Sequence, residues 1–140
     1  MRTLVDIFGE QNLSLWESTT AVTDHLVDWR RAADPQADRV GIYAVSDSTQ
    51  LDAGGMQQLR NFLLADASWL LDSQTRHRPM PSHLLEMQSA SGRGLFFFDR
   101  RGRQFGEITD AGTNHADLRA DFSTLLDSWL NDGENQAKGD

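Results

Sequence analysis

The pattern of apolar and polar positions is clearest between Ser82 and Asp110. Three short apolar runs, LLEM, LFFF and FGEI, are separated there by the polar stretches SASGRG and DRRGR. Apolar runs of this length, bounded by glycine and charged residues, are typical of strands. We predict three antiparallel strands, with Arg101-Gly102 forming the reversal between Leu95–Asp99 and Gln104–Thr109.

Two of the predicted strands lack the alternation of a half-buried strand. Phe96, Phe97 and Phe98 are consecutive, so they cannot all point to one side of a sheet. The segment RVGIYAVS, Arg39–Ser46, has no charge after its first residue and is rich in β-branched and aromatic residues. Both patterns favour central strands that are covered on both faces.

Helical spacing predicts a first helix that begins at Ser14 and ends before Pro35. Ser14-Leu15-Trp16-Glu17 matches a capping box, in which serine and glutamate each accept a backbone N–H. Apolar residues then recur at steps of four and three, at Leu15, Thr19, Val22, Leu26 and Trp29. The same spacing predicts a closing helix capped by Asn114, with Leu118, Phe122, Leu125 and Trp129 on one face.

The segment from Gly55 to Asp72 predicts a second helix whose apolar surface is unusually wide. A helix that covers one sheet face needs an apolar stripe of only about 100°. The additional width in so small a domain favours a homodimer. The expected dimer interface consists of Met56, Leu59, Phe62, Leu63, Leu64 and Leu71.

Together these elements predict an α+β fold, an α/β sandwich. A central, mainly antiparallel sheet of about four to five strands is covered by three helices. Residues 1–12 are expected to form an N-terminal arm or a short strand, and residues 13–130 a single domain. Residues 131–140, NDGENQAKGD, have nothing apolar to bury and are expected to form a disordered tail.

Composition narrows the function classes. The chain has 140 residues and no cysteine, which excludes disulfides, thiolate metal sites and thiol nucleophiles. No apolar run approaches 18 residues, and Asp6, Glu10 and Glu17 argue against a signal peptide. We therefore expect a cytoplasmic protein that does not bind a membrane.

The charge distribution is uneven. A net charge of −8 argues against binding to nucleic acid. Six arginines nevertheless lie between Arg76 and Arg103, against two acidic residues. Solvated turn residues explain this cluster simply, but arginine also recognises carboxylates in a planar, bidentate way. The expected partner-binding residues are Arg93, Arg100, Arg101 and Arg103, and we expect the first to lie at the opposite end of the strands from the others.

No catalytic or cofactor motif is visible. Four histidines, at 25, 77, 83 and 115, show no metal-ligand spacing, and His25 is expected to be a partly exposed helix residue. The loop Ser89–Gly94 lacks the spacing of a phosphate-binding loop. We therefore expect a non-enzymatic protein that binds no cofactor and no metal.

The layout from about Asp24 to Leu130 resembles the Roadblock family of dynein-light-chain-like domains. The resemblance lies in RVGIYAVS leading into a long apolar helix, followed by HLLEMQSASGRGLFFFDRRGRQFGEITDAG and a closing helix. It implies a homodimer with abutted second helices and a continuous sheet. It also implies a scaffold or regulator that serves a small GTPase or a motor complex.

Two alternatives remain open. If Leu4–Phe8 is a strand, the order of elements approaches that of thioredoxin, and without cysteine such a protein would be an assembly chaperone. The acidic composition is also typical of immunity or inhibitor proteins that mask a basic protein surface.

The absence of a ligand motif generates a first prediction. Thermal melts with chelator, with divalent ions, and with GTP or ATP should have the same midpoint. A ligand present at one hundred times its dissociation constant would stabilise the fold by about 2.7 kcal/mol. A midpoint that rises with any of these additions would contradict the expectation of a ligand-free fold.

Overall fold

The computed structural model describes residues 3–71, 80–100 and 103–119. Eight strands, three α-helices and two 3-10 helices follow one another along these residues. The elements are α1 (Leu4–Phe8), α2 (Glu10–Ser18), β1 (Ala21–Val27), η1 (Trp29–Arg31), β2 (Arg39–Val40), β3 (Tyr43–Gln50), α3 (Ala53–Leu64), η2 (Asp66–Ser68), β4 (Trp69–Leu70), β5 (Pro81–Ser89), β6 (Gly92–Asp99), β7 (Gln104–Thr109) and β8 (Gly112–Leu118).

Over the described ranges, the strands form one antiparallel sheet in the order β2-β3-β1-β5-β6-β7-β8-β4. Strands β5 to β8 form a meander in which each strand pairs with the next. Strand β1 joins the free edge of β5, so that His25 lies opposite Leu84. The sheet therefore combines a local meander with a pairing between distant parts of the chain.

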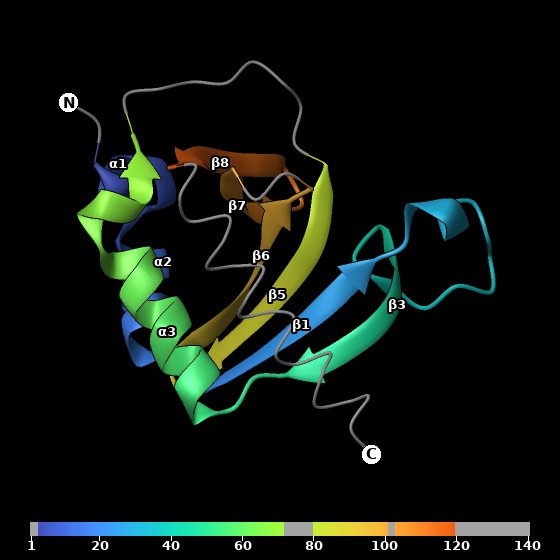
Figure 1. Cartoon of the computed structure of the whole chain (residues 1–140), viewed down its shortest axis with the longest axis horizontal. Helices are drawn as coiled ribbons and strands as arrows, with labels where there is room; N and C mark the ends of the chain where they lie inside the picture. The colour runs from blue at the N-terminus through green and yellow to red at the C-terminus, as the bar shows by residue number, and fades with distance from the viewer. Residues whose placement is uncertain (1–2, 72–79, 101–102, 120–140) are drawn as a thin grey trace.

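All three α-helices gather at one side of the sheet, as Figure 1 shows, with α3 beside α2 and α1 near β8. A capping box starts α1, because Thr3 and Asp6 each accept the other's backbone N–H. Gly9 separates α1 from α2 with a φ of 84°, a conformation that glycine adopts without a steric penalty. The side chain of Arg60 in α3 donates to the Thr19 carbonyl and ties α3 to the end of α2.

The main core lies between these helices and the sheet and is built around aromatic rings. Trp16 of α2 is fully buried. Its ring lies 5.2 Å from Phe8, 5.7 Å from Phe96 and 5.7 Å from Phe105, in edge-to-face contacts. Trp69 stacks on it at 6.2 Å. Such pairs contribute about 0.5–1.5 kcal/mol each beyond the area that they bury.

A smaller core lies on the opposite face of the sheet, which we call the open face. Val45, Leu84 and Phe97 are buried there, with Val40 and Leu95 packed against them. Phe97 thus points away from Phe96 and Phe98, which lie in the main core. This confirms the prediction that the strand with three phenylalanines is covered on both faces.

The β2–β3 hairpin covers part of this face because the sheet is strongly curled. A β-bulge interrupts the pairing of β1 with β3 between His25 and Val27, and bulges increase local twist. The hairpin tip consequently reaches β6, where a Cβ on Gly41 would lie 3.9 Å from Leu95. Strand β3 is three places away from β6 in the sheet order.

The predicted fold class is wrong. Within residues 3–71, 80–100 and 103–119, the sheet has eight strands rather than four to five, and the three α-helices lie on one of its faces. The predicted strands Leu95–Asp99 and Gln104–Thr109 are confirmed by β6 and β7. The predicted strand Arg39–Ser46 is interrupted, because a turn at Gly41-Ile42 divides it between β2 and β3.

The first predicted helix is the largest error. Helix α2 ends at Ser18, and β1 occupies Ala21–Val27. The apolar spacing suited a helix, but the segment STTAVT is rich in β-branched residues, which favour a strand. The predicted capping box at Ser14 is also wrong, since α2 already begins at Glu10.

The other two predicted helices also change. Helix α3 ends at Leu64, and the remainder of the predicted second helix forms η2 and β4. Asn114 lies within β8 instead of capping a helix, and its side-chain amide donates to the carbonyl of Ile7. Residues 120–130 of the predicted closing helix and the predicted tail at 131–140 lie outside the described residues.

The N-terminal segment is neither an arm nor a strand. Leu4, Ile7 and Phe8 are buried in the main core from the short helix α1. The alternative that made Leu4–Phe8 a strand, as in a thioredoxin-like order, is therefore wrong on this element.

The close packing of the meander generates a second prediction. In Gly106→Ala, the new Cβ would lie 2.6 Å from the Asn114 carbonyl oxygen and 2.6 Å from a ring carbon of Phe97. We expect a loss of about 1–3 kcal/mol, as for other overpacked sites. Gly54→Ala is the control, because its nearest neighbour would lie at 3.5 Å. Urea unfolding measures both, and equal stability of the two variants would contradict the expectation.

Candidate functional site: an apolar end surface and a histidine array

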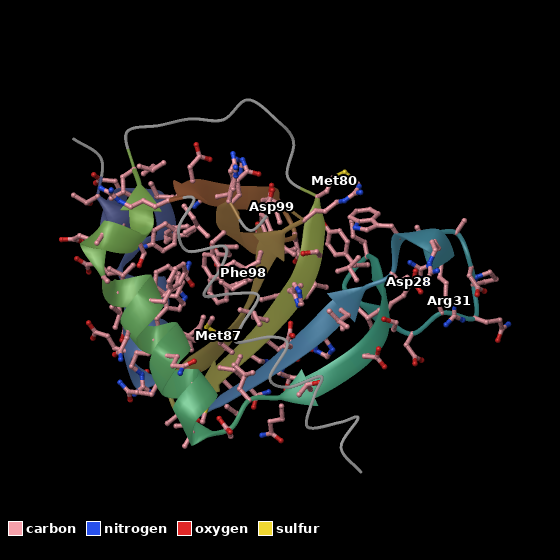
Figure 2. The ribbon with its side chains drawn as sticks, viewed as in Figure 1. Asp28, Arg31, Met80, Met87, Phe98 and Asp99 are labelled. Carbon is pink, nitrogen blue, oxygen red and sulfur yellow. The ribbon has the colours of Figure 1, made fainter. Side chains whose placement is uncertain are left out.

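Large apolar side chains are exposed in η1, at the tip of the β2–β3 hairpin and just before β5. Ile42 is 80% exposed, while Trp29 and Met80 are each 43% exposed. The half-buried Tyr43 lies beside Trp29, with ring centroids 5.9 Å apart and nearly perpendicular planes. We call these four residues the apolar end surface. Figure 2 shows Met80 at the start of β5, close to the loop that carries Asp28 and Arg31.

Hydrogen bonds to the backbone fix the shape of this surface. The Trp29 indole N–H donates to the Pro81 carbonyl at 2.9 Å, which holds η1 against the start of β5. The Arg39 guanidinium donates to the carbonyls of Ala32, Asp34 and Ile42 at 2.8, 3.1 and 3.2 Å. Arg39 therefore clamps the η1–β2 loop to the tip of the hairpin.

Asp34 organises the same loop. Its carboxylate accepts the backbone N–H of Gln36 at 2.8 Å and the guanidinium of Arg31 at 3.0 Å. The Gln36 bond first, and then the Arg31 bond, hold the pKa of Asp34 below its ordinary value. The loop is thus ordered by local contacts even though it is exposed.

Two exposed arginines, Arg100 and Arg103, lie near the start of β5. The backbone N–H of Arg100 donates to the Met80 carbonyl at 2.8 Å, so the exposed Arg100 lies next to the apolar end surface. The buried carboxylate of Asp99 accepts the backbone N–H groups of Arg103 and Gln104, which shapes the turn. Arg103 is exposed as well, and Arg101 lies outside the described residues.

Arg93 lies at the opposite end of β5 from Arg100. It pairs with Gln88 near the end of β5, whereas Arg100 lies beside the start of that strand. For the described Arg93, Arg100 and Arg103, the expected separation into two groups is confirmed, so these three do not form one patch.

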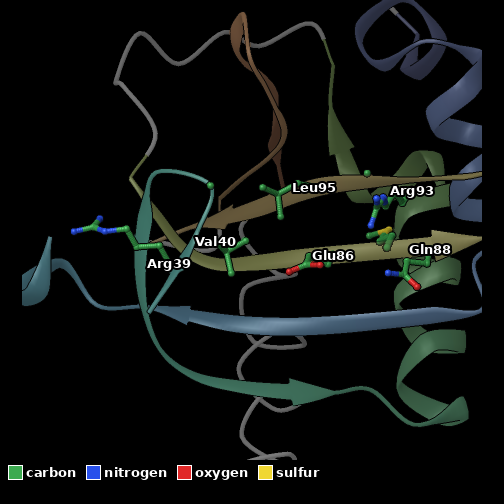
Figure 3. Close-up of a pocket in the computed structure, with 9 residues that line it drawn as sticks. Arg39, Val40, Glu86, Gln88, Arg93 and Leu95 are labelled. Carbon is green, nitrogen blue, oxygen red and sulfur yellow. The ribbon is translucent and has the colours of Figure 1, made fainter. Parts of the chain in front are cut away.

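Arg93 instead borders a groove on the open face. The groove, of about 400 Å³, lies between the β2–β3 hairpin and strands β5 and β6 (Figure 3). Val40 and Leu95 supply apolar wall, while Glu86, Gln88 and Arg93 supply polar groups. Glu86 and Arg93 are diagonal neighbours across β5 and β6.

Glu86 also belongs to a chain of three side chains that crosses β3, β1 and β5. The His25 Nε2 lies 2.7 Å from Glu86 Oε1, and its Nδ1 lies 2.6 Å from Ser48 Oγ. We call Ser48, His25 and Glu86 the histidine array. The His25 side chain is 11% exposed and that of Glu86 is 43% exposed, so the array runs from a shielded imidazole to solvent.

A second histidine pairs with a carboxylate on the helix-facing side of the same strands. The His83 Nδ1 lies 3.1 Å from Asp24 Oδ1, and both side chains are largely shielded from solvent. Strands β1 and β5 therefore carry one histidine–carboxylate pair on each face.

The residues predicted for a dimer interface lie in or against the chain's own core. Leu59, Phe62 and Leu63 are buried in the main core, and Met56, Leu64 and Leu71 pack against it. The apolar width of the second helix is thus used within the chain, which removes the reason that pointed to a second molecule. The homodimer itself stays a prediction.

Sequence reasoning missed the histidine array. His25 was expected on the surface of a helix, but it is a buried residue of β1. Glu86 lies 61 residues away in the chain, and Ser48 lies 23 residues away. The only sequence signal was the β-branched segment around Val22, which places His25 on a strand.

Comparison with known proteins adds no relative. No family model, no curated protein and no solved structure matches this chain. In the part of the chain that the structure describes, no cluster of three or more histidine, aspartate or glutamate side chains is arranged to hold a metal ion. No helix in that part is long and apolar enough to cross a membrane.

The clamp on the loop generates a third prediction. Arg39→Ala removes three bonds to carbonyls, so amides between residues 32 and 42 should exchange hydrogen on the order of tenfold faster. The midpoint of thermal unfolding should hardly move, because these bonds lie on the surface. Arg30→Ala is the control, since that side chain is 92% exposed. Unchanged exchange in the Arg39 variant would show that the loop does not depend on the clamp.

Proposed function

We propose that this protein is a protein-binding module that docks a partner on the apolar end surface. The observation that carries the proposal is the exposure of Trp29, Ile42 and Met80, with Trp29 bonded to Pro81 next to Met80 and Arg100 bonded to Met80. Aromatic residues, methionine and arginine are enriched in protein interfaces, and tryptophan, tyrosine and arginine dominate their hot spots. A single exposed apolar residue would not indicate an interface, because such residues are common on protein surfaces.

The loop that carries these residues supports the proposal further. A binding surface loses less conformational entropy on association when its side chains are already held in place. Trp29 is fixed by its bond to Pro81, and the clamp of Arg39 holds the backbone at Ile42. The apolar end surface is therefore preorganised for binding.

The expected partner presents an apolar recess bordered by carboxylates. The recess would take Ile42 and Met80, and the carboxylates would pair with Arg100, Arg103 and Arg101. Local charge decides this pairing, even though the chain as a whole carries −8. Arg93 lies at the opposite end of β5 and is not part of this surface.

The narrower functions stay predictions. They are a homodimeric scaffold or regulator of the Roadblock type for a small GTPase or motor complex, and an acidic immunity or inhibitor protein. A cytoplasmic location belongs to the same proposal. A specific protein partner is common to all of these functions, and nucleic acid or a membrane is not part of them.

The proposal predicts which surface variants lose the partner. Ile42→Asp and the double variant Arg100→Glu with Arg101→Glu should each reduce capture of the partner from a cell lysate at least tenfold. This corresponds to about 1.4 kcal/mol, within the range of a hot-spot residue. Their thermal midpoints should match wild type, because Ile42 and Arg100 are exposed. Quantitative mass spectrometry of crosslinked proteins provides the measurement.

Val5→Asp is the matched control. Val5 is 42% exposed on α1, away from the apolar end surface, so this variant should keep the partner. Equal loss in the control and in Ile42→Asp would indicate nonspecific apolar capture. If wild type is a dimer by light scattering and Ile42→Asp is a monomer, the partner is a second copy of the chain. Retained binding in all variants would contradict the proposal.

A further inference from the structure

Partner binding on the apolar end surface does not explain the histidine array. Three polar side chains with complementary hydrogen-bonding roles are aligned across three adjacent strands. His25 and Ser48 are directly opposite each other on β1 and β3, so they lie on the same face. Glu86 lies on that face too, since its cross-strand partner Thr23 is two residues from His25.

The chemistry of the three groups fixes the direction of the hydrogen bonds. An ionised carboxylate can only accept, so the contact with Glu86 places the imidazole proton on Nε2. The Nδ1 of the neutral ring is then an acceptor, and it receives the Ser48 O–H at 2.6 Å. This is the arrangement of a hydroxyl, its base and a carboxylate that orients the base.

The surroundings shield the base and leave the hydroxyl accessible. His25 is 8% exposed, with the fully buried Leu84 directly opposite it on β5. Ser48 lies in the exposed half of β3, residues 46–50. Glu86 also lines the groove of about 400 Å³, whose apolar wall includes Val40 and Leu95. An acyl donor can thus approach Ser48 from solvent, while the groove borders the array at Glu86, on the other side of His25.

We infer that Ser48 is an activated nucleophile that accepts an acyl group from an activated carboxylic ester, with His25 as its general base and Glu86 as the positioning residue. The inference goes beyond partner binding, and it revises the expectation of a chain without catalysis. The inference depends on Ser48, His25 and Glu86, none of which belongs to the apolar end surface. Either proposal can therefore fail without the other.

The reaction balances with the groups present. The Ser48 Oγ forms a bond to the ester carbonyl carbon while its proton passes to His25 Nδ1. Glu86 stabilises the resulting imidazolium through the Nε2–H bond. The ester C–O bond then breaks, and the leaving alcohol takes the proton from Nδ1. Water repeats the sequence on the acyl-serine and releases the carboxylic acid.

A fluorophosphonate probe tests the nucleophile directly. Ser48 Oγ would bond to phosphorus, fluoride would leave, and the proton would pass through His25 to solvent. We expect one probe per chain, mapped to Ser48 by peptide mass spectrometry, and none on that peptide in Ser48→Ala. His25→Gln should slow labelling on the order of one hundredfold, the lower range for loss of a general base. Ser46→Ala is the control, because Ser46 is exposed on the same strand and should not affect the rate.

The outcomes decide the inference. Labelling of Ser48 that slows in His25→Gln and in Glu86→Gln supports it. No labelling at Ser48, or the same rate without the histidine, overturns it and leaves the array as a brace between strands. Circular dichroism and thermal melts establish that each variant is folded. If His25→Gln does not fold, Glu86→Gln decides, since the Glu86 side chain is 43% exposed and its loss should not unfold the chain.

Discussion

The packing of aromatic rings around Trp16 is the interaction on which the fold depends. Its ring contacts come from α1, from β4, and from β6 and β7 in the meander, so one residue of α2 joins four separate segments. Replacing a buried tryptophan with alanine typically costs about 3–5 kcal/mol, which is a large fraction of the stability of a small domain. Helices α1 and α2 contribute Phe8 and Trp16 to this cluster, and α3 packs beside it through Phe62, whose ring lies 6.2 Å from Phe98.

The curl of the sheet is the second feature on which the candidate sites depend, because it folds the β2–β3 hairpin over the open face. The bulge between β1 and β3 brings the β2–β3 hairpin over Leu95, and this creates the groove. The same hairpin carries Tyr43, whose ring lies beside Trp29. The two candidate surfaces are therefore consequences of one distortion, although they lie at different places and have different chemistry.

Sequence reasoning succeeded where structure is local. The strands around the three phenylalanines have turn residues at their ends, and their pairing partner is the next segment in the chain. It failed at β1, where helical spacing and β-branched composition disagreed and a distant partner strand decided the outcome. The three described arginines, Arg93, Arg100 and Arg103, could be assigned to opposite ends of the strands from the predicted meander. The contact of His25 with Glu86 could not be found, since it depends on a pairing that no local pattern reports.

The place of β1 in the sheet bears on how the chain assembles. Strands β5 to β8 pair with sequence neighbours, whereas β1 must find a distant β5: Glu86 lies 61 positions after His25 in the sequence. Closing a long loop costs conformational entropy before its contacts repay it, so local pairings form faster. The meander should accordingly be complete while β5 is still an edge strand with unpaired backbone groups. During that interval β5 is open to strands of other chains, and the arrival of β1 ends the exposure.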